Sequence, residues 1–410
     1  MKATSDAIVV GAGPCGSFAA LNMAKHGANV VVLEEHEEVG VPSHCAGHLS
    51  IKGLKSLGLH QLSAEIVENS FCGATFYSPK GRSFSIRFSQ PVTCVVNRVL
   101  FDKYIAKMAE DNGVEYRLNS RVESLIIENG FAKGAIAKQN GRSYQKFLSK
   151  IVVDGEGISS RILRQTGLTG LNRHMLVNGV ETELENVKDV EMDTVEVFLG
   201  KSYAPNFYAW LIPKGDDRAK LGLAAKTGNP KELLLKLMVK HPIASKKLRT
   251  AKILQTNFHA LTLGGPIKRA YSNGFLAVGD AASQVKPTTG GGVIFGMTSA
   301  RIAAEVAYEA LKRNDFSAEF LSLYQRRFAE ILGFDMNVML RIRKILNAVS
   351  DEKLERIISL CSRMELNKTL TNFEDLDFQG KALINALRYP RVLATAILFS
   401  FFCAAEILKS

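Results

Sequence analysis

The chain has 410 residues, of which 46% are hydrophobic and 22% are charged; this composition predicts two or three packed units and excludes a disordered or fibrous protein. Its six cysteines include no CxxC pair, which argues against a disulfide scaffold, a zinc ribbon or an iron–sulfur cluster and favours a reduced, cytosolic compartment. The formal net charge of +12 favours an acidic partner, such as anionic lipid, an acidic redox protein or nucleic acid.

A short apolar run, residues 7–10, leads into a glycine-rich turn with the pattern GxGxxG, and a helix is expected from about residue 17 to residue 26. Gly11 permits the tight turn, Gly13 lets the backbone approach a pyrophosphate, and Gly16 lets helix and strand pack closely. The pyrophosphate is expected at the N-terminus of the helix, where Cys15 lies within the motif. A turn of this kind between a strand and a helix predicts a dinucleotide site.

A second strand pattern, residues 29–33, ends at the acidic residue Glu34. Dinucleotide-binding folds place such a carboxylate on the ribose hydroxyl pair, which favours a cofactor without a 2′-phosphate. The neighbouring Glu35 is the alternative for the same role.

A strand pattern in residues 274–278 ends at Gly279-Asp280, and a glycine-rich loop then precedes a helix. This segment resembles the GD motif of the flavoprotein hydroxylase superfamily, whose aspartate contacts the ribityl chain of the flavin and whose next helix points its N-terminus at the isoalloxazine ring. The resemblance implies that FAD is the cofactor and that it is bound by Asp280, Gly290, Gly291, Gly292 and Val293.

Three further positions agree with this resemblance. Arg98 opens a helix pattern (RVLFDKYIAKMA), and its counterparts in relatives reach the cofactor. Val122 lies in a strand pattern (RVESLII), at a position that usually offers backbone bonds to the adenine. Asp154 and Arg161 resemble the DG motif of the superfamily, although such residues also commonly cap and pin a helix.

Two segments narrow the family: residues 41–48 (VPSHCAGH) and residues 204–215 (APNFYAWLIPKG), which contain the single tryptophan. Together they resemble the CxG and PxxYxWxFPK-type motifs of the geranylgeranyl reductase family, with Ile212 where phenylalanine is usual. Within that family the chain is most similar to the archaeal digeranylgeranylglycerophospholipid reductases. The resemblance implies FAD-dependent saturation of isolated double bonds in geranylgeranyl chains of membrane ether-lipid precursors, with hydride from the reduced flavin N5.

The family resemblance assigns catalytic roles to Cys45, Tyr208 and Trp210, and it places Cys45, Ala46 and His48 beside the flavin. Phe207, Tyr208 and Trp210 are expected on one strand, where period-two alternation puts Tyr208 and Trp210 on the same face, and these two rings suit a flat wall for a polyprenyl chain. The alternatives are that these aromatics belong to an ordinary sheet core and that Cys45 is a small buried hydrophobe. His44 and His48 flank Cys45, but the intervening Gly47 and the lack of further ligands argue against a metal site.

The predicted fold class is α/β, α+β overall: a Rossmann-type FAD-binding domain of the flavoprotein hydroxylase type, interleaved with an antiparallel-sheet substrate domain and followed by a C-terminal helical region. The predicted boundaries are 1–71, 96–171 and 266–315 for the FAD-binding domain, 72–95 and 172–265 for the substrate domain, and 316–410 for the helical region.

Near the C-terminus, residues 392–405 form an uncharged run that is shorter than the ~20 residues of a membrane span. We expect an interfacial helix, a peripheral association with the membrane and a polyprenyl lipid substrate. The expected electron donor is a ferredoxin, a nicotinamide or a deazaflavin, and no nucleic acid is expected. The alternatives are a reductase of another geranylgeranylated substrate, of chlorophyll or quinone type, and a flavin monooxygenase or halogenase-like enzyme; halogenases carry tryptophan where this chain has Tyr208.

Overall fold

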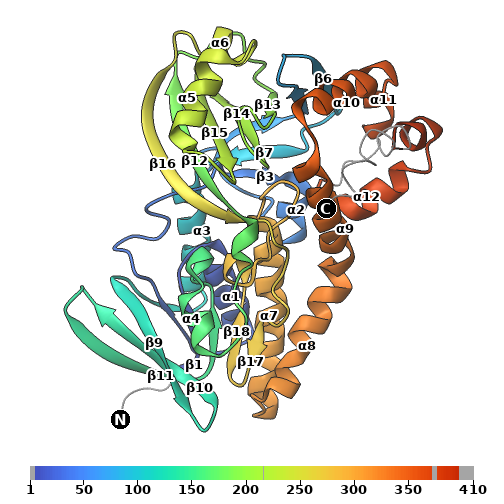
Figure 1. Ribbon diagram of the computed structural model, residues 1–410. Helices are drawn as coiled ribbons and strands as arrows, with labels where there is room; N and C mark the ends of the chain where they lie inside the picture. The colour runs from blue at the N-terminus through green and yellow to red at the C-terminus, as the bar shows by residue number, and fades with distance from the viewer. Residues whose placement is uncertain (1–4, 216, 372–375, 397–410) are drawn as a thin grey trace. The chain divides into compact units, whose positions relative to one another are not determined.

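The structure is a computed structural model that describes residues 5–215, 217–371 and 376–396 (Figure 1). These residues form two compact units, and each unit is assembled from three separate stretches of chain. Unit 1 comprises residues 5–43, 98–174 and 262–336, and unit 2 comprises residues 44–97, 175–261 and 337–396. Interleaving of this kind is what the predicted domain order requires.

The elements of unit 1, in chain order, are β1 (Ser5–Val10), α1 (Pro14–Lys25), β2 (Val30–Leu33), α3 (Arg98–Glu110), β8 (Glu115–Arg117), β9 (Ser120–Glu128), β10 (Phe131–Gln139), β11 (Ser143–Asp154), η1 (Gly157–Ser159), α4 (Arg161–Gln165), η2 (Arg173–Met175), β17 (Tyr271–Ser272), β18 (Phe275–Ala277), η3 (Gly279–Ala282), α7 (Val293–Arg313), α8 (Ala318–Phe328) and η4 (Ala329–Gly333).

A largely parallel sheet organises unit 1, with the strand order β17-β18-β11-β1-β2-β8. The strands β1 and β2 lie inside this order and are apolar, as is typical of parallel strands whose two faces are both covered. The helix α1 begins at Pro14, whose fixed φ suits the first helical position, and it packs against α3 and α7. The strands β9, β10 and β11 form an antiparallel meander (Figure 1).

The elements of unit 2 are β3 (His48–Ser50), α2 (Ile51–Ser56), β4 (Val67–Phe71), β5 (Gly73–Tyr77), β6 (Ser83–Arg87), β7 (Thr93–Val96), β12 (Leu176–Glu185), β13 (Thr194–Leu199), β14 (Tyr208–Gly215), β15 (Arg218–Ala225), α5 (Pro230–Lys240), α6 (Ala244–Lys247), β16 (Lys252–Thr262), α9 (Phe334–Ala348), α10 (Asp351–Arg363), α11 (Asn367–Leu370) and α12 (Gln379–Ala386). The strand β16 and the helix α9 each cross a unit boundary by a few residues.

A seven-stranded sheet with the order β16-β12-β15-β14-β13-β5-β6 forms the body of unit 2, and a small sheet, β3-β7-β4, accompanies it. All pairings given for the large sheet are antiparallel except that of β13 with β5. The inward side chains of β12, β14 and β15 pack under α5 and α6, where Leu221, Leu223, Leu234 and Leu237 are buried. The opposite face of the same three strands carries the candidate residues described below.

The predicted α/β architecture with an antiparallel-sheet second part and C-terminal helices is confirmed. Three stretches group differently from the predicted boundaries. Residues 316–336, predicted as part of the helical region, group with unit 1, where α8 packs on α7 and β17. Residues 44–71 belong to unit 2 because β3 and β4 pair with β7. Residues 337–396 also group with unit 2, where α10 and α11 pack on β6.

Most of the predicted interfacial helix near residues 392–405 lies outside the described residues, which end at residue 396. Within the described part of the chain, no helix is both long enough and apolar enough to cross a bilayer.

Candidate functional site

Three glycines shape the turn between β1 and α1, and the structure separates their roles. Gly11 has a φ of +89°, and a Cβ there would lie 2.7 Å from the carbonyl oxygen of Gly155. A Cβ on Gly16 would lie only 2.0 Å from the carbonyl oxygen of Gly11. Gly13 has an ordinary φ of −63°, and nothing lies within 4 Å of its Cβ position. The fold therefore requires Gly11 and Gly16, whereas the open space at Gly13 leaves room for a ligand to approach the main chain.

Glu34 lies at the end of β2 and turns its carboxylate toward this turn. Its Oε2 accepts a hydrogen bond from the Ala12 backbone N–H at 2.7 Å, and its Oε1 accepts one from the His36 N–H at 2.9 Å. The side chain is held by main-chain donors on both sides, so its position beside the glycine turn is fixed. A carboxylate in this position suits a hydroxyl pair of a ribose.

The N-terminus of α7 forms a second loop-and-helix junction in unit 1. In the described part of the chain no side chain caps this terminus, and its first backbone N–H groups are suited to an external acceptor. A Cβ on Gly292 would lie 2.9 Å from Oδ1 of Asp280, so this glycine lets the loop approach the carboxylate. Burial raises the pKa of Asp280, and the Arg98 guanidinium partly opposes this rise. Arg98 also donates hydrogen bonds to both oxygens of Asp102, at 3.0 and 2.9 Å.

The thiol of Cys15 faces the interior of unit 1. Its Sγ lies 2.4 Å from the Cβ position of Gly296 on α7 and 2.9 Å from that of Gly279. Burial raises the pKa of this thiol, so it stays protonated at neutral pH. The side chain therefore packs α1 against α7, and only the main chain of Cys15 is available to a cofactor.

The DG motif residues and Val122 meet around the short helix α4. Arg161 donates to the backbone carbonyl of Val122 and to Glu123, which joins α4 to β9. Glu156, and not Asp154, accepts from the N–H groups of Ile162 and Leu163 at the start of α4. Arg161 thus fastens α4 to β9, as the structural alternative for this residue expects, and Glu156 caps the N-terminus of α4.

Asp154 is fully buried at the end of β11. Its Oδ1 accepts from the Glu156 N–H at 3.0 Å, while Oδ2 has no hydrogen-bond partner among the described residues. Burial, followed by the nearby charge of Glu156, raises the pKa of Asp154 well above its usual range. Oδ2 of Asp154, beside the glycine turn, can therefore accept a hydrogen bond from a ligand when the carboxyl group is ionised, or donate one when it is protonated.

In unit 2 the segment 44–48 is fastened to the large sheet. The carbonyl oxygen of Ala46 accepts a hydrogen bond from Nζ of Lys220, a buried lysine on β15, at 3.1 Å. His48 contacts the Thr93 hydroxyl at 2.8 Å, and the Cys45 sulfur accepts from the Gly47 N–H at 3.5 Å. Cys45 is half-buried, and the anchor at Lys220 fixes the main chain beside it.

Tyr208 and Trp210 lie on one face of β14, as the alternation predicts, with their rings edge to face at 5.9 Å. Phe207 was expected on the strand as well, but β14 begins at Tyr208, and the Phe207 ring stacks on that of Tyr208 at 4.3 Å. Burial raises the pKa of Tyr208 to about 12, with Arg343 opposing, so its hydroxyl is neutral at pH 7. The guanidinium of Arg343 lies 5.0 Å from the centre of the Phe207 ring.

The indole of Trp210 is held in place by two residues on neighbouring strands. Its Nε1–H donates to Oε2 of the buried Glu181 on β12 at 3.1 Å. Gly222 on β15 lies opposite both Trp210 and Glu181, and a Cβ there would lie 2.4 Å from Cζ2 of the indole. The ring therefore lies flat over a glycine and is fixed in its plane by a carboxylate.

Charged side chains surround this indole on the same face of the sheet. Lys214 contacts Glu68 and Glu183, both at 2.8 Å, and Lys220 lies 3.5 Å from Glu68. Burial lowers the pKa of Lys214, but its hydrogen bonds to Glu183 and Glu68 outweigh burial and raise it overall. Paired charges of this kind hold their strands in register.

His259 on β16 packs against Gly179, two residues before Glu181 on β12. Burial, with a smaller contribution from His44, lowers its pKa to about 4, so it is neutral at pH 7. Its Nδ1 is buried and has no hydrogen-bond partner among the described residues. Sequence reasoning missed Glu181, Gly222, Lys220 and His259; the one signal for them was the run of charges and glycines within strand patterns such as GVETELE and KLGLAAK.

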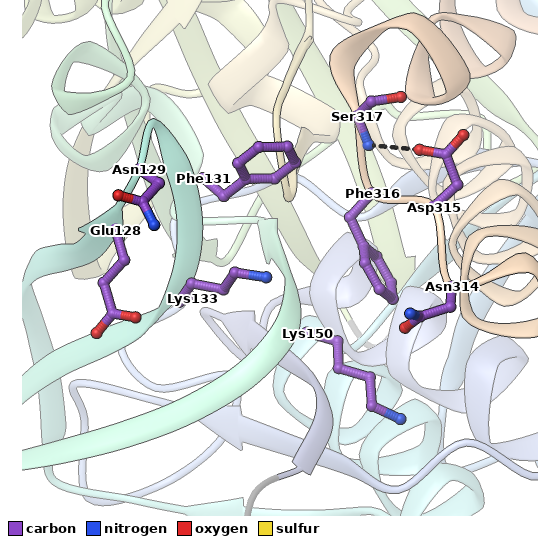
Figure 2. Close-up of a pocket in the computed structure, with 9 residues that line it drawn as sticks. All are labelled: Glu128, Asn129, Phe131, Lys133, Lys150, Asn314, Asp315, Phe316 and Ser317. Atoms are coloured by element: carbon purple, nitrogen blue, oxygen red, sulfur yellow. Dashed lines mark hydrogen bonds between the residues drawn. The ribbon is translucent and has the colours of Figure 1, made fainter.

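A separate cavity of about 490 Å³ lies in unit 1, between the β9–β10 turn and the loop from α7 to α8 (Figure 2). Figure 2 shows Lys133 between the rings of Phe131 and Phe316, at 5.4 and 5.9 Å from their centres. None of the predicted site residues lines this cavity.

The residues of unit 1 fit a flavin dinucleotide. The open space at Gly13, the carboxylate of Glu34 and the uncapped N-terminus of α7 are suited to a pyrophosphate, a ribose and a polarised ring carbonyl, respectively. Among the described residues, no group occupies the Cβ position of Gly13, and no packing contact explains a glycine there.

Comparison with known proteins agrees with this geometry. The FAD binding domain family matches residues 4–324. Digeranylgeranylglycerophospholipid reductase 2 of Methanopyrus kandleri is 33% identical over 397 residues, which cover 95% of this chain and 98% of that protein. The corresponding reductase of Methanocaldococcus jannaschii is 32% identical and covers 86% of this chain and 89% of its own length.

Comparison with solved structures also finds a flavoprotein fold and a geranylgeranyl reductase-like relative. A geranylgeranyl bacteriochlorophyll reductase-like protein of Thermoplasma acidophilum superposes with a TM-score of 0.87 at 26% identity and covers 97% of this chain and all of that one. A flavin-dependent brominase has a TM-score of 0.68 at 19% identity, with each chain fully covered, and shares only the fold. The chain therefore belongs to the FAD binding domain family and, within it, to the digeranylgeranylglycerophospholipid reductases.

Proposed function

We propose that this protein is an FAD-dependent oxidoreductase that saturates isolated double bonds in the geranylgeranyl chains of archaeal membrane ether-lipid precursors. The observation that carries the proposal is the match, over 95% of the chain, to a reductase named for digeranylgeranylglycerophospholipid. The glycine turn of unit 1 and the aromatic sheet face of unit 2 support it from geometry.

In this proposal unit 1 holds the cofactor. Gly11, Gly13 and Gly16, with the main chain of Cys15, receive the pyrophosphate, and Glu34 receives the ribose hydroxyls. The rest of the FAD is assigned to the loop 290–292, Val293, Asp280, Arg98 and Val122. The family resemblance assigns Cys45, Ala46 and His48 to the same cofactor. When bound and reduced, FAD supplies the hydride that saturation of an alkene needs.

Saturation of one double bond adds one hydride and one proton, and the residues of unit 2 are assigned to the substrate side. Tyr208 and Trp210 form a flat apolar wall for the polyprenyl chain, and Glu181 and Gly222 hold that wall in one orientation. A fixed wall orients an otherwise flexible chain and excludes water from it. The proton is assigned either to the flavin itself or to the region of Cys45, whose main chain Lys220 anchors through Ala46.

The direct test uses purified protein with its flavin reduced anaerobically by dithionite and supplied with an unsaturated digeranylgeranylglyceryl phospholipid. Mass spectrometry of the extracted lipid should show a ladder of products that each gain two hydrogens. Unchanged lipid beside a stably reduced flavin would reject this substrate, and geranylgeranylated pigments or quinones would then be tested. Oxygen-dependent consumption of a nicotinamide would instead favour a monooxygenase.

Cys45 has its own test. The variant C45A should bind FAD as the parent protein does but lose most of its turnover, whereas C94A, which alters a buried cysteine on β7, serves as the matched control. Full turnover in C45A would remove Cys45 from the catalytic residues.

The electron donor and the membrane surface are further parts of the proposal. A substrate lipid resides in a bilayer, so a peripheral association with the membrane is expected. The excess of basic residues suits an acidic ferredoxin as donor, and reduced nicotinamides and deazaflavins are the alternatives to be compared by anaerobic flavin reduction.

A further inference from the structure

Positive charge is concentrated in one segment of unit 2. Residues 230–252 contain seven basic residues and one acidic residue, so they carry a net charge of +6 out of +12 for the whole chain. This segment comprises α5, α6 and the connection to β16. A basic excess confined to one segment indicates a surface rather than a general property of the protein.

The helix α5 is apolar on two sides. Leu234 and Leu237 face the core of unit 2 and are fully or almost fully buried. Leu235 and Val239, four residues apart on the outer side, are 43% and 72% exposed. Since ordinary surface helices carry charged residues on the outer side, two adjacent exposed aliphatic side chains call for an apolar partner.

The strand β16 adds two apolar side chains on the same face of the sheet. Thr256 contacts the hydroxyl of Thr182 at 3.3 Å, and Thr182 lies between Val180 and Leu184 of β12, which belong to the core under α5. Strand alternation therefore puts Leu254 and Phe258 on this face. They are 50% and 53% exposed because β16 is an edge strand that α5 leaves uncovered.

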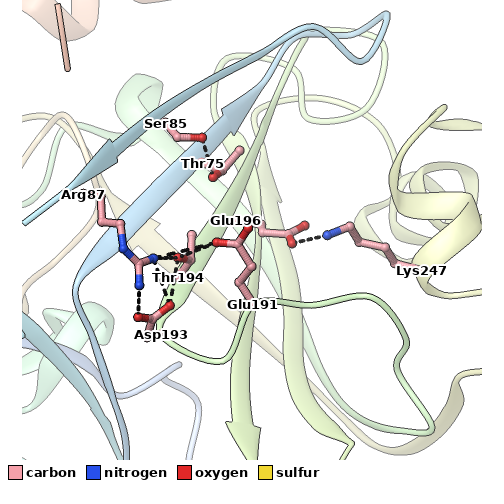
Figure 3. Close-up of polar contacts among 8 residues, drawn as sticks. All are labelled: Thr75, Ser85, Arg87, Glu191, Asp193, Thr194, Glu196 and Lys247. Atoms are coloured by element: carbon pink, nitrogen blue, oxygen red, sulfur yellow. Dashed lines mark hydrogen bonds and ion pairs between the residues drawn. The ribbon is translucent and has the colours of Figure 1, made fainter.

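Three of the seven cations of the segment have partners within the protein. Lys247 reaches inward to Glu196, as Figure 3 shows, Lys236 donates to the carbonyl of Ser202, and Lys252 lies 3.7 Å from the carboxylate of Glu185. Four cations remain exposed, and among the described residues none of their side chains forms an ion pair: Lys231, Lys240, Lys246 and Arg249. These four cations and the four exposed apolar side chains are called the α5–β16 surface below.

We propose that the α5–β16 surface binds an anionic membrane, with the apolar side chains entering the interface and the cations meeting lipid phosphates. The proposal deepens the proposed function and rests on it for the bilayer location of the substrate. A lipid surface explains the composition better than a protein partner does, because protein interfaces are depleted in lysine and enriched in aromatic residues. Interfacial helices, by contrast, combine exposed aliphatic residues with lysine and arginine.

The test is flotation of the FAD-loaded full-length protein with vesicles that contain no polyprenyl substrate. Vesicles of phosphatidylcholine mixed with phosphatidylglycerol should carry the protein upward, vesicles of phosphatidylcholine alone should not, and high salt should weaken the binding. The variant K231E/K240E should bind at least about 25-fold more weakly, since each basic residue contributes about fivefold. The variant L235S/V239S should bind about tenfold more weakly at unchanged charge.

Matched controls separate the surface from general charge and hydrophobicity. The variant K55E/K146E makes the same change in net charge with two exposed lysines elsewhere, and I127S removes another exposed aliphatic side chain. Both controls should float like the parent protein. Equal weakening by K55E/K146E, or flotation unchanged in both surface variants, would overturn the proposal.

The outcomes also separate this surface from the reductase function. Reduction of detergent-dispersed lipid should be unchanged in K231E/K240E, whereas reduction of lipid in vesicles should fall with binding. Flotation that depends on the surface without any lipid reduction would retain the surface and reject the proposed function. Reduction in detergent by a protein that never floats would reject the surface and retain the function.

Discussion

The two units supply candidate residues in opposite ways. In unit 1 the glycines Gly11, Gly13 and Gly16 lie in the turn after β1 and in the first turn of α1, and they contribute main chain and small size. In unit 2 the candidate residues lie within strands, at Trp210, Glu181 and Gly222, and two of them contribute large side chains held by partners on other strands. Recognition through main chain leaves a local sequence pattern, whereas recognition through side chains depends on the register between strands.

The substitution Gly16→Ala is expected to have the largest effect, and it tests whether the glycine turn of unit 1 depends on close main-chain contact. The new Cβ would lie 2.0 Å from a main-chain oxygen that cannot rotate away, so we expect a loss of more than about 3 kcal/mol in the free energy of unfolding, together with loss of FAD. Urea unfolding of the apoprotein measures the free energy of unfolding, and flavin fluorescence measures the bound FAD. An apoprotein as stable as the parent would contradict the prediction and show that the main chain at Gly11 can shift to accommodate the new methyl group.

Gly13→Ala sharpens the comparison because the same change meets no protein atom within 4 Å. The stability of the apoprotein should change by less than about 1 kcal/mol. The affinity for FAD should fall about 100-fold, which is about 2.7 kcal/mol, because the methyl group enters the space assigned to the pyrophosphate. Unchanged affinity in a fluorescence titration would move the pyrophosphate away from Gly13.

Gly222→Ala tests the side-chain half of the comparison. Its Cβ would overlap the indole at 2.4 Å, so Trp210 must leave its hydrogen bond to Glu181. Turnover should fall by about tenfold or more with FAD affinity unchanged, because a displaced wall misorients the chain. Trp210 is the only tryptophan, so its fluorescence spectrum reports the movement directly. Gly170→Ala, which meets only one side-chain atom at 3.8 Å, is the control and should leave both readouts unchanged.

The smallest expected effect concerns His259 and pH. Its pKa is about 4 in the folded protein against an ordinary value of 6.5, so the unfolded chain binds the proton more readily between these values and stability falls as pH falls through them. From pH 7 to 5.5 this residue should cost about 1 kcal/mol. Urea unfolding at both pH values should show a smaller loss in H259Q, whereas H60Q, which alters an exposed histidine, should lose as much as the parent. Equal losses in H259Q and the parent would contradict the assignment.

Much of unit 1 follows from the sequence because its determinants are local. The apolar runs at residues 7–10 and 30–33, the glycine turn and the acid at the end of β2 are each contained in a few adjacent residues. The helix α1 begins at Pro14, a few residues earlier than the expected start near residue 17, since proline favours the first helical turn.

Unit 2 was less predictable because its contacts join distant residues. Glu181 and Trp210 are 29 positions apart and meet only through the registers of β12, β15 and β14. Residues 44–71 follow the cofactor motif in sequence, yet pairing of β3 and β4 with β7 draws them into unit 2. The expected strand position of Phe207 failed because the Phe207 N–H closes a turn onto the Ala204 carbonyl.

The interleaving of the two units has a consequence for biosynthesis. The strand β18 pairs with β11, and α7 packs on α1, so β11 and α1 wait for partners that emerge from the ribosome only after most of unit 2 has been synthesised. Folding during translation normally completes an N-terminal domain before the next one begins, and here neither unit can be completed first. The nascent chain therefore exposes an unpaired edge of β11 and the apolar side of α1 until β18 and α7 have been synthesised, and it should depend on chaperones more than a protein whose domains follow one another in sequence.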